Sequence, residues 1–377
     1  MSKNIHTVLN ALQTLAPLEL AEPWDNTGLL LSPSKPRPID RIMLTIDLTQ
    51  AVVDEAVARK TRLIVAYHPV IFEPLKRITG KLAALVENRI AVYSPHTALD
   101  AAPGGVNDWL ADGLAPAPGS KGESQRAPLS PHFAHLPGGS HKLVVFVPTN
   151  HVDALRDALS QIGCGGIGNY THCSFNLEGY GTFLGNEQTH PVVGMAGRLE
   201  RVPEIRLEML CSLDMLPTIT STIHRVHPYE EPAWEVYPIQ PVPRDGVGQG
   251  RLITLKRPVT LSTLLRRIRK HLNLPHLRVA APDDVQRGKR KITTIAVCPG
   301  AGGSVFKSVT ADAYLTGEMR HHDVLAKREA GSVVVLTDHT NTERGYLPTL
   351  RDNLRKALGK SVKIEIARSD RDPLTIV

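Results

Sequence analysis

The chain has 377 residues, of which 42% are hydrophobic and 21% are charged. This balance supplies enough apolar surface for a folded core and argues against a disordered chain, and the length predicts two or three domains at roughly 150 residues each. The formal charge of +7 suits a small anionic ligand such as a nucleotide, but it is too small for a typical nucleic-acid-binding surface.

Hydropathy and cysteine content narrow the class of protein further. No apolar run approaches the roughly 20 residues that span a bilayer, and the first residues lack the pattern of a secretory signal, so we expect a cytoplasmic protein. The four cysteines stand singly, which argues against a disulfide framework and against a thiolate zinc site. The 16 histidines indicate that any metal chemistry uses histidine and carboxylate ligands.

Predicted helices and strands alternate from the start of the chain. The spacing of apolar residues predicts helices over 5–20, 50–60 and about 79–89. Apolar, β-branched runs predict strands over 41–49, 63–69 and 90–100, the last running into a turn or short helix. This alternation predicts a mostly parallel sheet, in which functional groups gather at the carboxyl ends of the strands.

A segment rich in Pro, Gly and Ser, residues 113–140, is predicted to be a linker or long surface loop. The following block has the order β-α-β-β-α-β, which is typical of a ferredoxin-like α+β domain. Its strands are expected at 141–148, within 171–200, at 204–212 and at 234–239, and its helices at 151–163 and 215–227. Residues 240–248 are interpreted as the returning linker.

The α/β pattern resumes at residue 251. Strands are predicted at 251–258, 291–300, 311–318 and 332–339, and helices at 261–272 and over most of 344–358. A weak internal repeat relates the strands before His68 to those before His339, so each half offers a strand-end histidine. We therefore expect an α/β fold with two similar lobes in one discontinuous domain (1–140 and 244–377) and an inserted domain (141–243).

Three groups at predicted strand ends form a candidate metal site. His339 and Glu343 are spaced i, i+4 and can reach one ion from one face of a helical turn. His96 and Asp100 repeat this spacing, and His68 comes from a third strand end. These ligands suit zinc, manganese or iron(II), and two such ions about 3.5–4 Å apart could activate a water and hold a phosphate oxygen.

Other polar residues allow a functional and a structural interpretation. Glu318 and His321 are candidate acid–base groups beside the metals, or simply mark the start of a helix. The glycine-rich turn after Cys298 either cradles a phosphate or is a tight turn, which we favour. Asp25 either caps a helix or contacts the site. In the insert, four residues either bind a metal or small ligand or belong to loops that pack on the small sheet, and we favour the packing role. They are His172, His227, Glu230 and Glu231.

Several motifs together resemble the NIF-three-like family, often described as type-2 GTP cyclohydrolase I or as dinuclear metal-binding proteins. They are WDNTGLLL (24–31), YHPVIF (67–72), SPHTALDAAPGGVNDWLA (94–111), YLTGEMRHHD (314–323) and DHTNTERGY (338–346). The inserted block, with GCGGIGNYTHCSF (163–175) and HPYEEPAW (227–234), looks like the PII-like insert of the longer members.

The resemblance implies two divalent metal ions between the lobes. The matching ligands would be His68, Asp100, His339 and Glu343, with Asp100 and Glu343 as candidate bridging carboxylates and His96 in or near the coordination sphere. It also implies ring-shaped hexamers. This chain has Tyr67 where many bacterial members have a second histidine beside His68, so either the phenolate or a water would fill that position.

The sequence supports two hypotheses for function. The first is a metal-dependent hydrolase that acts on a small phosphorylated or nucleotide-like substrate. The second is a non-enzymatic metal-handling or regulatory protein whose insert senses a ligand. A scaffold for transcription partners is a third hypothesis, suggested only by the family's name, and the absence of a DNA-binding motif argues against direct nucleic-acid contact.

Overall fold

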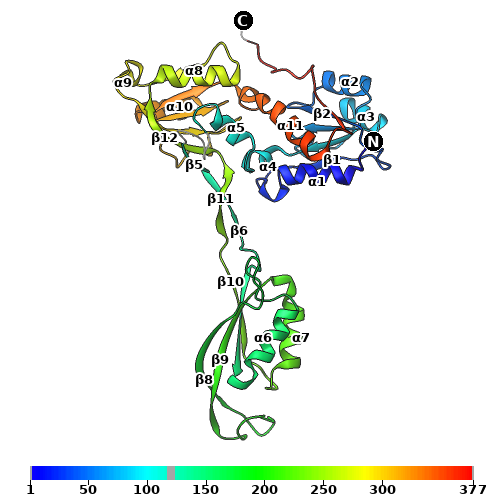
Figure 1. Cartoon of the computed structure of the whole chain (residues 1–377), viewed down its shortest axis with the longest axis vertical. Coiled ribbons are helices and arrows are strands. Elements are labelled where there is room, and N and C mark those ends of the chain that lie inside the picture. Colours follow the sequence, from blue (N-terminus) through cyan, green and yellow to red (C-terminus); the bar gives the residue numbers. More distant parts are fainter. Residues whose placement is uncertain (1, 117–123, 376–377) are drawn as a thin grey trace. The chain divides into compact units, whose positions relative to one another are not determined.

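The computed structural model describes residues 2–116 and 124–375. The chain divides into two compact units, one made of 1–132 and 244–377 and the other of 133–243 (Figure 1). Among the described residues, no helix combines the length and the apolar character needed to cross a membrane.

The first lobe of the larger unit contains a five-stranded sheet with the order β1-β4-β3-β2-β17. Its central strands are parallel, and β1 pairs with β4 antiparallel. The three central strands are short, mainly apolar and almost fully buried, as expected for a sheet that is covered on both faces. The strands of the sheet are β1 (Gly28–Leu31), β2 (Arg41–Thr45), β3 (Leu63–Ala66), β4 (Ala91–Ser94) and β17 (Lys363–Ile366).

Helices cover both faces of this sheet. Helices α1 (Ile5–Leu15) and α11 (Leu347–Leu358) bury their apolar residues against one face, and α2 (Gln50–Ala58) and α3 (Gly80–Glu87) against the other. The first helix ends at Leu15 rather than at residue 20, and a short 3₁₀ turn follows it. Pro17 accounts for this early end, because proline lacks an amide proton for the helical ladder.

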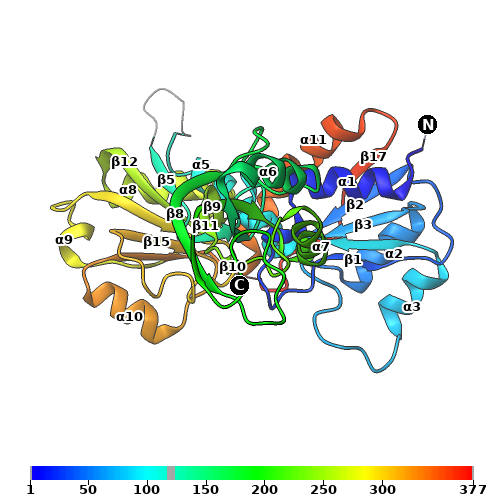
Figure 2. The same ribbon diagram turned by 90° about the horizontal axis from the view of Figure 1, so that it is seen from below.

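The second lobe contains a six-stranded sheet with the order β13-β16-β15-β14-β12-β5 (Figure 2). Its helices are α8 (Leu261–Leu272), α9 (Asp283–Gln286) and α10 (His321–Glu329). The strand expected at 311–318 is limited to four residues. The strands are β5 (Gln125–Ala127), β12 (Arg251–Val259), β13 (Arg278–Ala280), β14 (Ile292–Val297), β15 (Ala313–Thr316) and β16 (Val333–Leu336).

The two sheets share a topological core. In each, three consecutive strands lie side by side and parallel (β2-β3-β4 and β14-β15-β16), and an antiparallel strand pairs with the third. The strand before His339 therefore corresponds to β4, which precedes His96. The internal repeat expected from the sequence matched the strand before His339 with the strand before His68. That correspondence is wrong, because His68 follows β3, the middle strand of its three.

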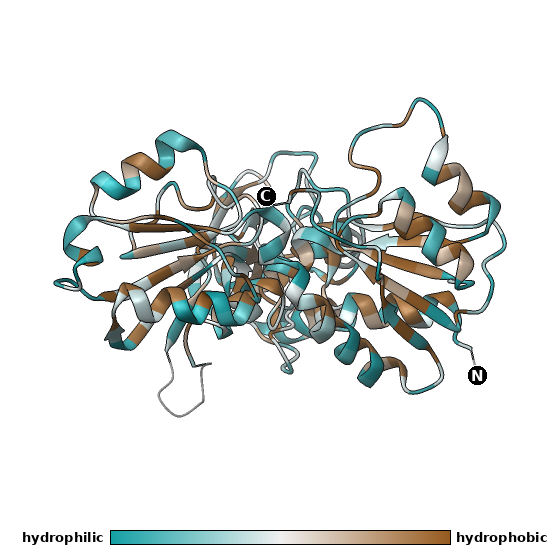
Figure 3. Cartoon of the chain, turned by 90° about the horizontal axis from the view of Figure 1, so that it is seen from above, coloured by the Kyte–Doolittle hydropathy of each residue, from teal (hydrophilic) through white to brown (hydrophobic). Residues whose placement is uncertain are grey.

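Helix α5 (Val106–Asp112) joins the two lobes. Val106 belongs to the core of the first lobe, Leu110 and Ala111 belong to the core of the second, and Trp109 packs against both. The strands are mainly apolar, whereas the helices present polar residues on their outer sides (Figure 3). Helix α5 therefore connects the cores of the two lobes within one compact unit.

The smaller unit has the element order β-α-β-β-α-β that the sequence predicts, with an antiparallel sheet of order β10-β7-β9-β8. Its two helices pack on one face of the sheet. Strand β7 has the predicted bounds. The elements are β7 (His141–Pro148), α6 (Val152–Gln161), β8 (Phe175–Leu184), β9 (Leu199–Cys211), α7 (Leu216–Val226) and β10 (Trp234–Pro238).

The two segments expected to be linkers contain strands. Strands β6 (Ser130–Ala134) and β11 (Val242–Gln249) pair as a two-stranded sheet, and β5 joins the second lobe by pairing with β12. Each segment alone has the composition of a loop, but its backbone groups are satisfied by a partner distant in sequence. Residues 117–123 of the expected linker lie outside the described part of the chain.

Candidate metal centre

The candidate site residues lie just beyond the carboxyl ends of the parallel strands. His68 follows β3, and helix α4 (His96–Ala101), which carries His96 and Asp100, follows β4. From the second lobe, His339 and Glu343 follow β16, where a 3₁₀ turn (His339–Thr342) places them. Strand ends of this kind are the usual location of ligand sites in parallel sheets.

His68, His339 and Glu343 form a candidate metal-binding cluster, with one ligand atom from each lying within 4.8 Å of the others. Glu343 Oε2 is 3.4 Å from His68 Nε2, and Glu343 Oε1 is 3.4 Å from His339 Nε2. The carboxylate therefore lies between two imidazoles that come from different lobes. The i, i+4 spacing does bring His339 and Glu343 together.

The environment of Glu343 fits a bound cation. Its side chain is only 2% exposed, and Oε2 is buried without a hydrogen-bond partner among the described residues. A buried carboxylate oxygen in this state is costly unless a cation or donor reaches it. Two histidines and a carboxylate are ligands that zinc and similar divalent ions accept.

Each of the three site histidines has an acidic partner at its Nδ1 atom. Asp47 Oδ1 lies 2.8 Å from His68 Nδ1, Asp25 Oδ1 lies 2.8 Å from His96 Nδ1, and Glu318 Oε2 lies 3.4 Å from His339 Nδ1. Such partners fix the tautomer and leave Nε2 for a metal. This is the arrangement that commonly surrounds metal-ligating histidines.

The charges around His68 are strongly coupled. Burial opposes its protonation, but the hydrogen bond to Asp47 and the negative charges of Glu343 and Asp47 raise the pKa of His68 to about 10. Although burial alone would raise it, the pKa of Asp47 is lowered by His68 and by the Arg344 charge. Without metal, a protonated His68 therefore bonds to Asp47 and lies 3.4 Å from Glu343 Oε2 without a hydrogen bond to it, and a cation must displace that proton.

Asp100 is a buried carboxyl group close to this cluster. Burial raises its pKa to about 7, and the charge of Glu343 acts in the same direction, whereas the hydrogen bond from Tyr67 lowers it. The Tyr67 hydroxyl donates that bond over 2.6 Å. Burial and the Asp100 charge raise the pKa of Tyr67 well above its usual value, so the hydroxyl stays protonated and orients Asp100.

His96 is held in an unusual backbone conformation next to this pair. Its φ is +31°, which is uncommon for a residue with a side chain and is found at functional sites when the surroundings enforce it. The enforcing contacts come from Asp25, which also accepts a hydrogen bond from the Thr97 amide. Although burial would raise it, these bonds lower the pKa of Asp25.

Gly300 forms one wall of the cluster. Its φ is +57°, and a Cβ atom placed there would lie 2.7 Å from Glu343 Oε1 and 2.8 Å from His339 Nε2. The glycine-rich turn after Cys298 is thus a turn with positive φ, as favoured from the sequence, and it also brings backbone against the candidate ligands. Burial raises the pKa of the Cys298 thiol, which disfavours a nucleophilic thiolate.

Gly300→Ala is expected to weaken zinc binding at least tenfold, because the added methyl group displaces the carboxylate and the imidazole. Gly168→Ala is a matched control, since Gly168 has the same φ of +57° but a Cβ atom there would meet nothing within 4 Å. Zinc affinity measured by competition with a chelator tests this. An unchanged zinc affinity in Gly300→Ala would show that the methyl group does not intrude on the ligands.

Glu318 and His321 lie differently with respect to the cluster. Glu318 is exposed but within reach of His339 Nδ1. His321 is exposed at the start of α10, where it lines a separate cavity with Met319 and Leu336. The structure therefore brings Glu318 to the candidate centre, and it places His321 in the neighbouring cavity.

Sequence reasoning missed Asp47 and Arg344. Asp47 directly follows the apolar run of β2, so the same strand-end rule that selected His68 identifies it in retrospect. Arg344, whose guanidinium lies 3.7 Å from Asp47 and 2.5 Å from Asp370, has no such signal, because its partners are distant in sequence.

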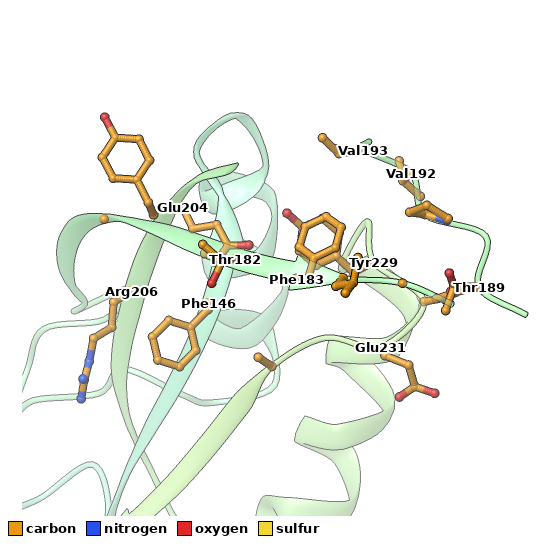
Figure 4. A pocket seen from close by; sticks show the side chains of 18 of the residues that line it. Phe146, Thr182, Phe183, Thr189, Val192, Val193, Glu204, Arg206, Tyr229 and Glu231 are labelled. Atoms are coloured by element: carbon orange, nitrogen blue, oxygen red, sulfur yellow. The ribbon is translucent and has the colours of Figure 1, made fainter. Parts of the chain in front are cut away.

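The smaller unit has a cavity of its own, with a volume of about 630 Å³. Phe146, Phe183 and Tyr229 lie around Glu204 and Thr182 in this cavity (Figure 4). Of the four insert residues considered from the sequence, Glu230 and Glu231 line it. His227 is buried and bonded to the Phe146 carbonyl, which agrees with a structural role in loop packing, whereas His172 is exposed.

Two linked α/β lobes with a histidine–carboxylate cluster at their shared strand ends define a candidate metal-binding protein with an inserted α+β unit. The chain belongs to the Duf34/NIF3 family (NGG1p interacting factor 3), whose profile matches residues 3–373. The resemblance inferred from the sequence motifs is thus confirmed.

Named relatives cover nearly the whole chain. NIF3-like protein 1 of Rattus norvegicus is 37% identical over 99% of this chain and 93% of its own length. A GTP cyclohydrolase 1 type 2 homolog of Halalkalibacterium halodurans is 32% identical over 99% of both chains. A solved Bacillus cereus protein related to NIF3 is 31% identical, with a TM-score of 0.68 over 100% of this chain and 99% of its own.

Proposed function

We propose that this protein is a dinuclear metal-dependent hydrolase acting on a small phosphorylated or nucleotide-like substrate. The observation that carries the proposal is Glu343, a buried carboxylate with an unpartnered oxygen between His68 and His339. The name of the Halalkalibacterium halodurans relative, a GTP cyclohydrolase 1 type 2 homolog, is consistent with a nucleotide-like substrate.

The proposed ligands divide into two sets. The first set is His68, His339 and Glu343, which offer two imidazole Nε2 atoms and one carboxylate. Asp100 and His96 extend the set toward a second ion, since the His96 ring centroid lies 5.6 Å from that of His68. We assign Asp100 and Glu343 as bridging carboxylates, and Tyr67 as the hydrogen-bond donor that orients Asp100 in place of a metal ligand.

A pair of zinc, manganese or iron(II) ions would supply Lewis acidity and an activated water. The chain's own residues would position the ligands and transfer protons. Asp25 and Asp47 hold the imidazoles in position, and Glu318, which is 55% exposed and within 3.4 Å of His339 Nδ1, is placed to exchange a proton with solvent. His321 would act only on a substrate long enough to reach the neighbouring cavity.

Metal counting combined with a substrate screen tests the proposal. We expect close to two metal ions per chain after purification without chelator, and turnover of phosphoesters or nucleotides by the loaded protein. The His68→Ala variant is expected to lose at least one ion and all turnover. Two bound ions without any turnover across the screen would refute the hydrolase assignment and leave a metal-handling role.

The cavity of the smaller unit favours a second candidate function, in which a PII-like insert senses a ligand and regulates the protein. Small-ligand sites are typically concave, largely apolar and equipped with a few polar groups, and the lining of this cavity by aromatic side chains and Glu204 fits that description. A ligand that binds wild-type protein but not Glu204→Gln, without altering metal content, would support this role.

We also propose a homo-oligomer, with a hexamer as the expected form, in the cytoplasm. The four cysteines are free, and three of them are buried, as is usual for proteins of reducing compartments. Sedimentation analysis of the full chain tests the expected state, and a monomer would refute it.

A further inference from the structure

Two exposed aromatic side chains lie beside the candidate metal centre. Trp24 is 62% exposed and Phe72 is 56% exposed, although rings of this size are usually covered. They come from segments distant in sequence, yet their ring centroids are only 6.1 Å apart. No role described above uses either ring.

Hydrogen bonds from neighbouring residues hold both rings in place. The side chain of Asp25, next to Trp24, is fully buried and bonded to His96 and Thr97. The side chain of Asn26 donates a 2.6 Å hydrogen bond to the carbonyl of Ile71, the residue before Phe72. These hydrogen bonds fix the backbone next to Trp24 and next to Phe72, so the two exposed rings project from ordered positions.

Trp24 lies a short distance from the candidate metal ligands. The Trp24 ring centroid is 6.1 Å from that of His96, which is in turn 5.6 Å from that of His68. A small substrate whose reacting group sits at the cluster can therefore reach Trp24 with a ring attached to it. The spacing fits a nucleotide, in which a sugar separates the phosphate from the base.

The angle between the rings indicates how a bound ring would be held. Trp24 and Phe72 are inclined at 59°, so a planar ligand can lie flat on only one of them and meets the other with its edge. Both contacts are favourable geometries for aromatic groups. Trp24 offers the larger face, and we expect it to provide the stacking contact.

We infer that Trp24 and Phe72 form a stacking subsite for a planar heteroaromatic ring, such as a nucleobase, of the substrate whose phosphate binds at the metal centre. This inference rests on the proposed function, and it adds the residues that select the substrate. Stacking alone is tolerant of base identity, so the subsite separates nucleotides from plain sugar phosphates rather than one base from another.

Binding of two probes to the zinc-loaded full chain tests the inference. Guanosine monophosphate carries a base, whereas ribose 5-phosphate has the same phosphate and sugar without it. Wild-type protein is expected to bind the nucleotide on the order of ten- to a hundredfold more tightly. Trp24→Ala should remove this preference without changing ribose 5-phosphate binding, Phe72→Ala should reduce it, and Trp24→Phe should retain part of it. Tyr170→Ala, which removes an aromatic ring that is 75% exposed in the smaller unit, serves as the matched control.

The outcomes separate this inference from the proposed function. Equal binding of both probes by wild-type protein, or an unchanged preference in Trp24→Ala, would overturn the stacking subsite and leave the phosphate-binding centre standing. Binding of neither probe would overturn both. Leu75 and Ile78 on the same loop are also exposed, and a change in oligomeric state of Trp24→Ala would assign the patch to contact between copies, which would equally overturn the inference.

Discussion

Glu343→Gln is expected to abolish tight metal binding while both lobes stay folded. The amide has nearly the shape of the carboxylate but carries no charge, so the two imidazoles lose the anionic ligand that lies between them. Because a ligand is removed, the loss of zinc affinity should exceed the roughly 10- to 100-fold effect typical of residues that only support a ligand. Stability should respond as well, since an ion at a hundred times its Kd stabilises a fold by about 2.7 kcal/mol.

Metal content per chain and the melting temperature, each with and without added zinc, test this expectation. Wild-type protein should melt at a higher temperature with zinc, and Glu343→Gln should show no such shift. Glu329→Gln, on the exposed side of α10, controls for the loss of one negative charge. A normal zinc shift in Glu343→Gln would place the ion away from Glu343 and refute the ligand assignment.

Metal affinity is expected to rise steeply with pH. His68 has a pKa of about 10 in the metal-free chain, so up to that pH an ion must displace one proton, which makes binding about tenfold tighter per pH unit. Below the Asp100 pKa of about 7, a second proton must leave and the dependence steepens. The free energy of unfolding of the metal-free chain changes with pH in the opposite direction. The stabilisation by protonated His68 is complete below about pH 6.5 and is lost as the pH rises toward 10.

Chelator competition between about pH 6 and 8.5 measures this dependence. Asp47→Asn is the informative variant, because it removes a carboxylate that raises the pKa of His68. We expect its zinc affinity to fall roughly 10- to 100-fold at pH 7 and its pH dependence to flatten first at the alkaline end. A wild-type affinity that does not vary with pH above 7 would show that His68 carries no proton for the ion to displace.

The sequence predicts the elements well where patterns are local. Strand β7 and helix α8 have the predicted bounds, because an apolar run or a helical stripe is contained within each. Prediction fails for β6 and β11, whose glycine- and proline-containing segments become strands only through each other. The internal repeat expected from the sequence matched the wrong strands for a related reason, because the order of strands in a sheet depends on contacts between distant segments.

For the candidate site, strand-end position and i, i+4 spacing are enough to select the three clustered residues His68, His339 and Glu343. The acidic residues that hold the site histidines are harder to predict from the sequence. Asp47 and Asp25 take their importance from contacts with His68 and His96 that join separate segments. The proton state of Tyr67 is likewise beyond prediction from sequence, because it follows from burial beside Asp100.

The pairing of β17 with β2 bears on how the protein is made. Residues 363–366 complete a sheet whose other strands lie within 28–94, so one edge of β2 stays unpaired until residues 363–366 have left the ribosome. At about 5–20 residues per second this delay is roughly 15–60 s. An unpaired edge invites association with other chains, and the ligands His339 and Glu343 also arrive late. Metal loading must therefore follow the synthesis of residue 343, and a chain cut before residue 363 should be prone to aggregation, because the edge of β2 then stays unpaired.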